Sequence, residues 1–304
     1  MKSTAMRITA LVATAATAVA LAGCTTTGAA SESEGTIALL LPESQTARYE
    51  AFDRPIFEER VAALGDFDVL YSNADQDAAK QQQQAEAALT AGAEVLVLDP
   101  VDAQAAVSIV ETANAEGIPV VSYDRLVAGG ELAYYISFDN EQVGVLQGET
   151  LVAALDADGA TGGILMVNGS PTDGNAALFK AGAHSVIDDS GYTVLAEFDT
   201  PDWSPENAQQ WVAGQLTQFE GQISAIYAAN DGTGGGAIAA LKAANVSPLP
   251  LVTGQDAELA GIQRIVAGDQ FMTIYKAIRA EAELAAEIAV ALLRGETVEG
   301  DTTV

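Results

Sequence analysis

Polar and charged side chains follow the short apolar runs of this sequence, and their types suit hydrogen bonding to hydroxyl groups. Carboxylates and amides exchange hydrogen bonds with adjacent hydroxyls, a guanidinium bridges two oxygens, and an aromatic ring covers a face of C–H bonds. The residues are Arg48, Tyr49, Asp124, Arg125, Asp173, Asn175, Trp203, Asn230, Asp231, Gln255, Asp256 and Lys276. Each of them alone is weak evidence for a binding site, since Asp and Asn often cap helices. As a set, they predict a site for a neutral ligand rich in hydroxyl groups.

A glycine-rich segment offers a different chemistry. Residues 232–237 (GTGGGA) match the dinucleotide-binding pattern G-x-G-x-x-G/A, which is typical of nucleotide-dependent oxidoreductases. Asp231 stands directly before this turn, however, where a carboxylate would repel a pyrophosphate. The segment also lies deep in the chain and not after a first strand. We therefore expect the glycines to let a helix pack close to a sheet, and we expect no cofactor.

Other catalytic patterns are weak. The single histidine, His184, and the single cysteine, Cys24, exclude a zinc site built from several His and Cys ligands. Carboxylate pairs such as Asp188 and Asp189 suit a glycosidase only if they flank one bond with separated acidities. An acidic chain supplies such pairs by chance. The sequence therefore predicts neither a metal site nor an enzyme.

The net charge of the chain limits the classes of partner that it can bind. The 304 residues include 13 Lys and Arg against 42 Asp and Glu, for a net charge of −29. Nucleic acids and anionic lipid surfaces are bound through clustered basic residues. The excess of acidic residues therefore argues against both as binding partners. Hydrophobic residues make up 49%, which is enough to bury a core.

Short apolar runs alternate with longer helical stretches such as 75–90 and 205–219. This alternation predicts an α/β protein with two doubly wound parallel-sheet lobes. The predicted strands are 36–41, 67–71, 95–99, 119–123, 133–138, 163–167, 193–198, 223–228, 250–254 and 271–275. Ligands of open parallel sheets lie beyond the carboxyl ends of the strands, where the polar set stands.

The first residues indicate export. Lys2 and Arg7 precede an uncharged run over 8–21, which is too short to span a bilayer but suits a secretory signal. The run ends in residues 21–24 (LAGC), which resemble the bacterial lipobox. We expect a signal peptide over 1–23, lipidation of Cys24 and a flexible tether over 24–35. The product would be a lipoprotein on the outer face of the cytoplasmic membrane, in the periplasm or at the cell surface.

Several blocks of the sequence resemble the bacterial solute-binding proteins of ABC sugar importers, of the type I periplasmic binding protein fold. The blocks are 123–125 (YDR), 135–140 (YISFDN), 169–173 (GSPTD), 203–207 (WSPEN), 229–231 (AND) and 254–257 (GQDA). The resemblance runs from about residue 36 to the end of the chain. Within the family it is strongest to members that bind D-xylose or several sugars.

The resemblance implies a monomeric receptor that encloses a monosaccharide, D-xylose, and passes it to an ABC permease. The first lobe would comprise 36–138 plus 272–304, and the second 139–271. Arg48 and Arg125 would donate to ring or anomeric oxygens from the first lobe. Asn175, Asn230 and Asp256 would bind hydroxyls from the second.

Tyr49 and Trp203 would then sandwich the pyranose, with Asp124 and Lys276 on the hinge side of the cleft. Asp173 is also expected among the sugar-binding residues. The chain departs from its relatives in three places. Tyr49 stands where they carry Trp, and residue 174 is Gly where they carry Asn. The chain also stops at residues 301–304, where relatives continue through a third crossing, and a truncation is expected. The alternatives are a receptor for glucose, galactose or arabinose that serves import or chemosensing and, more distantly, the oxidoreductase. The ligand-sensing half of a repressor shares this fold, but the lipobox disfavours it.

Overall fold

The structure is a computed structural model that describes residues 33–299 and 301–304. The predicted signal peptide over 1–23, the lipidation site Cys24 and most of the tether over 24–35 lie outside the described residues. No helix in the part described is long and apolar enough to cross a membrane.

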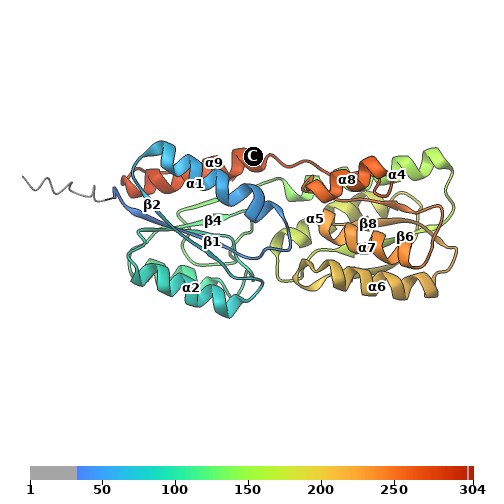
Figure 1. Cartoon of the computed structure of the whole chain (residues 1–304), viewed down its shortest axis with the longest axis horizontal. Coiled ribbons are helices and arrows are strands. Elements are labelled where there is room, and N and C mark those ends of the chain that lie inside the picture. Colours follow the sequence, from blue (N-terminus) through green and yellow to red (C-terminus); the bar gives the residue numbers. More distant parts are fainter. Residues whose placement is uncertain (1–32, 300) are drawn as a thin grey trace, which may run out of the picture. The chain divides into compact units, whose positions relative to one another are not determined.

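The first sheet has the strand order β10-β5-β4-β3-β1-β2, and each of its pairings is parallel. Its strands are β1 (Thr36–Leu41), β2 (Asp68–Asn73), β3 (Val95–Leu98), β4 (Val120–Tyr123), β5 (Tyr134–Ser137) and β10 (Asp301–Thr303). Alternate residues of β1 face opposite layers, as the pleat of a strand requires. Ile37 and Leu39 pack against α1 (Arg54–Leu64) and α9 (Ile278–Leu293). Ala38 and Leu40 pack against α2 (Ala78–Thr90) and α3 (Val107–Ala115). Figure 1 shows α1 and α9 on one face of this sheet and α2 on the other.

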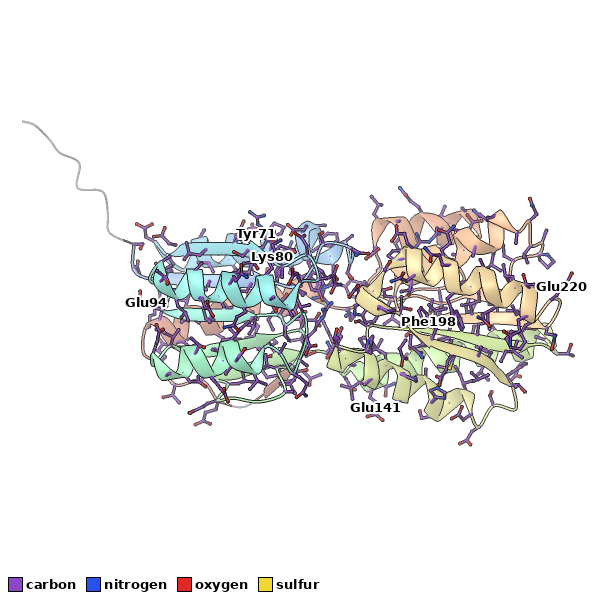
Figure 2. All side chains as sticks on the ribbon, turned by 90° about the horizontal axis from the view of Figure 1, so that it is seen from below. Tyr71, Lys80, Glu94, Glu141, Phe198 and Glu220 are labelled. Atoms are coloured by element: carbon purple, nitrogen blue, oxygen red, sulfur yellow. The ribbon has the colours of Figure 1, made fainter. Side chains whose placement is uncertain are left out.

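The second sheet has the order β7-β6-β8-β9, again all parallel. Its strands are β6 (Gly163–Asn168), β7 (Val194–Asp199), β8 (Ile223–Ala228) and β9 (Leu251–Val252). One face of β6 packs against α4 (Asn140–Asp158) and α5 (Gly174–Ile187), and the other against α6 (Pro205–Gln218) and α7 (Asp231–Ala243). The edge strand β7 carries Phe198, which stacks on Trp211 at 5.4 Å between ring centroids (Figure 2). Two doubly wound parallel sheets confirm the predicted fold class.

The predicted set of strands needs correction in two places. The run 271–275 is not a strand, since only Ile274 forms an isolated bridge, to Gln255. The chain leaves the second sheet here towards α9, so continuous pairing stops. β10 was not predicted, because its polar residues form no apolar run, yet it pairs in register with β5. The remaining predicted strands are present with shifts at their ends.

The glycine-rich segment over 232–237 opens α7 and serves packing. A Cβ atom on Gly236 would lie 2.1 Å from the carbonyl oxygen of Pro205, and one on Gly234 would lie 3.0 Å from that of Thr253. Glycine is needed at such close backbone approaches. Asp231, at the start of the helix, is fully buried and accepts a hydrogen bond from Gln270. These contacts agree with the predicted packing role.

Candidate ligand-binding site

The loops at the carboxyl ends of the two sheets meet in the described structure. The loop after β1 of the first sheet hydrogen-bonds to the loop after β9 of the second. In the same way, the loop after β2 contacts the loop after β7, and the loop after β3 contacts the loop after β6. The donor and acceptor pairs are Ala47 N to Glu258 Oε1 at 3.0 Å, Gln76 Nε2 to Asp202 O at 2.8 Å and Ala103 N to Thr172 O at 3.1 Å. The polar side chains that follow the strands are thereby brought face to face.

A small cavity lies among these loops, and both sheets contribute to its lining. All ten binding residues predicted from the sequence line it. The full lining is Thr46, Arg48, Tyr49, Asp124, Arg125, Asp173, Asn175, Phe179, Trp203, Asn230, Gln255, Asp256 and Lys276. The cavity measures about 20 Å³, which is room for about one water molecule. In this arrangement the lining side chains close on one another, so a larger ligand requires the loops to separate.

Arg48 is held by a group of buried acids. Its Nη2 lies 2.5 Å from Oδ1 of Asp53 and 2.7 Å from Oε2 of Glu281, and its Nε donates to Asp53 at 3.0 Å. Tyr123 also donates to Asp53. These contacts fix the guanidinium plane and leave Nη1 3.5 Å from Asp124 Oδ2, without a hydrogen bond. Nη1 is therefore the donor that Arg48 can offer to a ligand.

Three more lining atoms are buried without a hydrogen-bond partner in the described structure: Arg125 Nε, Gln255 Oε1 and Asp256 Oδ1. Arg125 Nε lies 3.0 Å from Asp173 Oδ2, but the N–H group does not point at this oxygen and the two atoms form no hydrogen bond. Asp256 Oδ1 lies 3.2 Å from the ammonium of Lys276. Buried polar atoms are rarely left unpaired, so these donors and acceptors are available to a ligand. A hydroxyl group both donates and accepts and so fits them.

The charges of the lining balance. Arg48, Arg125 and Lys276 face the carboxylates of Asp124, Asp173 and Asp256. Burial would raise the pKa of Asp124, but Arg48, Lys276 and Arg125 outweigh it and lower that pKa, so this carboxylate is ionised at neutral pH. Burial raises the pKa of Asp173, and Arg125 only partly opposes the change. A balanced set of charges favours a neutral ligand over an anion or a cation.

Trp203 forms one wall. Its Nε1 donates to Asp173 Oδ2 at 3.0 Å, and its ring meets the ring of Phe179 edge to face at 6.3 Å. Gly169 lies against the ring, since a Cβ there would come within 2.1 Å of Cη2. The ring is thus fixed from several sides and presents a rigid apolar surface to the cavity.

Tyr49 differs from a simple stacking platform. Its hydroxyl donates to Asp124 Oδ2 at 2.9 Å, and its ring centroid lies 5.2 Å from Arg48 Cζ and 5.5 Å from Arg125 Cζ. Burial raises the pKa of the phenol, so it remains a neutral donor. Tyr49 therefore orients a carboxylate and two guanidinium groups in addition to covering the cavity.

Three lining residues have left-handed backbone conformations, which non-glycine residues seldom adopt. Asp124 has φ 54°, Trp203 φ 53° and Asp256 φ 89°. Such conformations cost free energy and persist where the surrounding contacts hold them, often at functional sites. They aim these side chains into the cavity.

Thr46 and Phe179 were missed as lining residues. Phe179 lies four residues after Asn175 on α5, so helical spacing alone places both on one face. Gln255 was in the wider polar set and does line the cavity, whereas Asp231 of that set does not. His184 lies on α5 away from the cavity and contacts Asp188 and Glu197.

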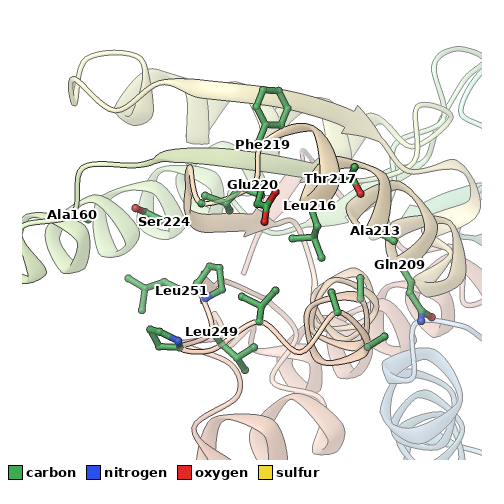
Figure 3. A pocket seen from close by; sticks show the side chains of 18 of the residues that line it. Ala160, Gln209, Ala213, Leu216, Thr217, Phe219, Glu220, Ser224, Leu249 and Leu251 are labelled. Carbon is green, nitrogen blue, oxygen red and sulfur yellow. The ribbon is translucent and has the colours of Figure 1, made fainter.

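A larger cavity of about 1010 Å³ lies at the amino ends of β8 and β9 (Figure 3). Its wall is mainly apolar and includes Leu216, Phe219, Leu249 and Leu251, and none of the predicted binding residues lines it. Its position opposite the carboxyl ends and its few polar groups make it a poor site for a hydroxyl-rich ligand. In the described residues no group of His, Cys, Asp or Glu is arranged to hold a metal ion.

Comparison with known proteins identifies the fold. Residues 37–297 match the model of the periplasmic binding protein domain family. The chain belongs to this family. The relatives found are sugar-binding receptors of transport systems, so the chain is a solute-binding protein and not an enzyme.

Two named relatives cover most of the chain. The D-xylose-binding periplasmic protein of Escherichia coli is 39% identical over 279 residues, which span 90% of this chain and 83% of that protein. A multiple sugar-binding periplasmic receptor of Rhizobium radiobacter is 33% identical over 88% of this chain and 80% of its own. Among solved structures, an ABC transporter solute-binding protein from Clostridium phytofermentans with bound β-D-glucose has a TM-score of 0.80, with 28% identity over 88% of both chains.

Proposed function

We propose that this protein captures a monosaccharide, D-xylose, between two lobes and delivers it to an ABC importer. The observation that carries the proposal is the cavity lining, with balanced charges, a fixed aromatic wall and unpaired buried donors and acceptors. The names of the relatives support the substrate class, since two of those found are D-xylose-binding periplasmic proteins. The similar solved structure of an ABC transporter solute-binding protein supports the transport role.

The lobes would be residues 36–138 plus 272–304 and residues 139–271. Because the cavity is only about 20 Å³, the sugar would enter when the loops separate and would be enclosed when they return. Inside, it would take the place of direct contacts such as Arg125 with Asp173 and the Nδ2 donation of Asn175 to the carbonyl of Asp124. The sugar hydroxyls would then pair the atoms that are now unpaired.

We expect D-xylose to bind more tightly than D-glucose. A hexose carries an additional hydroxymethyl group, and in a closed cavity its hydroxyl would be buried without a partner, at a cost of about 1–3 kcal/mol. This corresponds to a preference of roughly ten- to a hundredfold. Calorimetric titration with both sugars in one buffer tests the preference. Equal or tighter glucose binding would contradict it and would favour the multiple-sugar receptor, which the 33% identity to such a protein makes the second candidate.

The chain is also proposed to act as an exported monomer anchored through a lipid on Cys24, at the outer face of the cytoplasmic membrane. The support is the sequence LAGC at 21–24 after a charged start and an apolar run. We expect Cys24→Ala to release the protein from washed membranes into the soluble fraction, because one lipidated residue supplies the anchor. Immunoblotting of both fractions measures this. Retention of the variant in the membrane would argue against the anchor.

A further inference from the structure

Glu258 stands at the junction of the two sheets and makes an unusual contact for its position. It is the residue before α8 (Leu259–Ala267), where a side chain often caps its own helix, but its side chain makes no such bond. Its Oε1 instead accepts the backbone N–H of Ala47, in the loop after β1 of the other sheet, at 3.0 Å. Its exposed fraction is only 6%.

The contact joins the two halves of the cavity lining. Ala47 directly precedes Arg48 and Tyr49, and Glu258 follows Asp256 by two residues. Asp256 has φ 89° and Ala257 has φ 50°, so the short link to Glu258 has a defined shape. Movement of Glu258 away from Ala47 would therefore move lining groups of both sheets apart.

We propose that Glu258 is a positioning residue that fastens the loop of Arg48 to the loop of Asp256 when the protein closes on its sugar. Glu258 touches no sugar in this proposal, since it does not line the cavity. The inference rests on the proposed function and adds a residue outside the binding site that controls affinity.

The surroundings of Glu258 make the contact sensitive to pH. Two carboxylates of the same lobe are near it: Asp231 accepts the backbone N–H of Glu258 at 2.9 Å, and Asp256 lies two residues before it. Arg264 on α8 opposes them. Across the junction, Glu43 accepts the N–H groups of residues 45 and 46 in the loop that holds Ala47.

Burial, with repulsion from Asp256 and Asp231, raises the pKa of Glu258 from 4.5 to about 7. In the open form, with more water around the carboxyl group, we expect its pKa to lie nearer 4.5. A pKa that is higher in the closed form means that closing takes up a proton. Closure is then favoured at low pH, and this advantage is lost as the pH rises through about 7. A protonated carboxyl group still accepts the Ala47 N–H through its carbonyl oxygen.

The test is calorimetric titration of D-xylose between pH 5.5 and 8.5 with the full-length protein. With pKa values of 4.5 in the open form and about 7 in the closed form, we expect the wild type to bind roughly thirtyfold more tightly at pH 5.5 than at pH 8.5. Glu258→Gln keeps an acceptor oxygen without a charge, so its affinity should not change with pH and should be at least that of the wild type at pH 5.5. Glu258→Ala loses the acceptor and should bind about tenfold more weakly than Glu258→Gln throughout.

Gln76→Ala is the matched control, because it removes a different side-chain contact between the loops of the two sheets, Gln76 to the Asp202 carbonyl, without removing a titrating group or a residue of the cavity lining. It should weaken binding but keep the pH dependence of the wild type. Melting temperatures without sugar show whether each variant folds. A wild-type slope that persists in Glu258→Gln would show that another group titrates, such as Asp231, whose pKa burial raises to about 6, and would overturn the pH dependence assigned to Glu258.

The two proposals fail in different ways. Absence of D-xylose binding by the wild type at every pH would overturn the proposed function and, with it, this inference. Normal D-xylose binding by the wild type, together with unchanged affinity in folded Glu258→Ala, would overturn the inference alone.

Discussion

Replacing Arg48 with methionine is expected to lower the free energy of unfolding by about 3–5 kcal/mol. Arg48 is 1% exposed and neutralises Asp53 and Glu281, which lie within 2.7 Å of its Nη2. Methionine matches much of the volume but leaves these buried carboxylates without their cation. Burial, and then repulsion from Asp124, already raises the pKa of Glu281, with Arg48 opposing the change. The variant can relieve the repulsion only by binding protons or admitting water.

Urea unfolding at pH 7, followed by circular dichroism, measures this loss. Arg60→Met is the matched control, because Arg60 forms an ion pair with Glu287 at 2.5 Å while 37% of its side chain is exposed. Pairs exposed to that degree contribute about 0–1 kcal/mol, so this control should unfold near the wild-type midpoint. Equal effects of the two substitutions would show that the acids around Arg48 do not depend on it. If Arg48→Met folds, we also expect weaker sugar binding, since Nη1 is lost.

Much of the fold could be predicted because the strands are buried on both faces. The run 36–41 is almost wholly apolar, since each of its residues after Thr36 faces a helical layer. A prediction of a strand from apolar residues failed for 271–275. This run is apolar in part, but it carries Tyr275 at 75% exposure and forms only an isolated bridge at Ile274 in the described structure. The same prediction from apolar residues missed β10, because Asp301, Thr302 and Thr303 are polar. This strand forms by pairing with β5.

The lining of the cavity could be predicted because parallel sheets place their carboxyl-end loops together. The buried side chains that support the lining residues could not be predicted. Glu281 meets Arg48 across 233 residues of sequence, and nothing local distinguishes it from the other glutamates of α9. Asp231 has the position of a binding residue after β8, but Gln270 and Thr273 occupy its oxygens. Which polar groups are already satisfied depends on three-dimensional contacts, so sequence position alone cannot separate a ligand residue from a structural one.

The same reasoning separates the two tryptophans of the chain, which stand eight residues apart at 203 and 211. Trp203 lines the cavity, fixed by Asp173 and Phe179, whereas Trp211 stacks on Phe198 at the edge of the second sheet. We expect Trp203→Ala to raise the Kd for D-xylose roughly a hundredfold, about 2.7 kcal/mol, because the ring is a rigid, buried wall for the C–H face of a sugar. Trp211→Ala should change the Kd less than about threefold, although it removes an equal ring.

Asp256→Asn tests the polar side of the same cavity. The asparagine keeps the shape of the side chain but removes the charge that faces Lys276 at 3.2 Å. It also weakens the acceptor Oδ1, which accepts no hydrogen bond in the described structure. Hydrogen bonds to a charged group contribute about 1.5–3 kcal/mol, so the Kd should rise roughly ten- to a hundredfold. Asp269→Asn, which removes an acid from the exposed pair with Lys242, should leave the Kd near the wild-type value. Calorimetry on all four variants decides both points. Near-unchanged affinity in Trp203→Ala and Asp256→Asn, with melting temperatures that show folded protein, would remove these residues from the site, because a sugar held in this cavity must touch both.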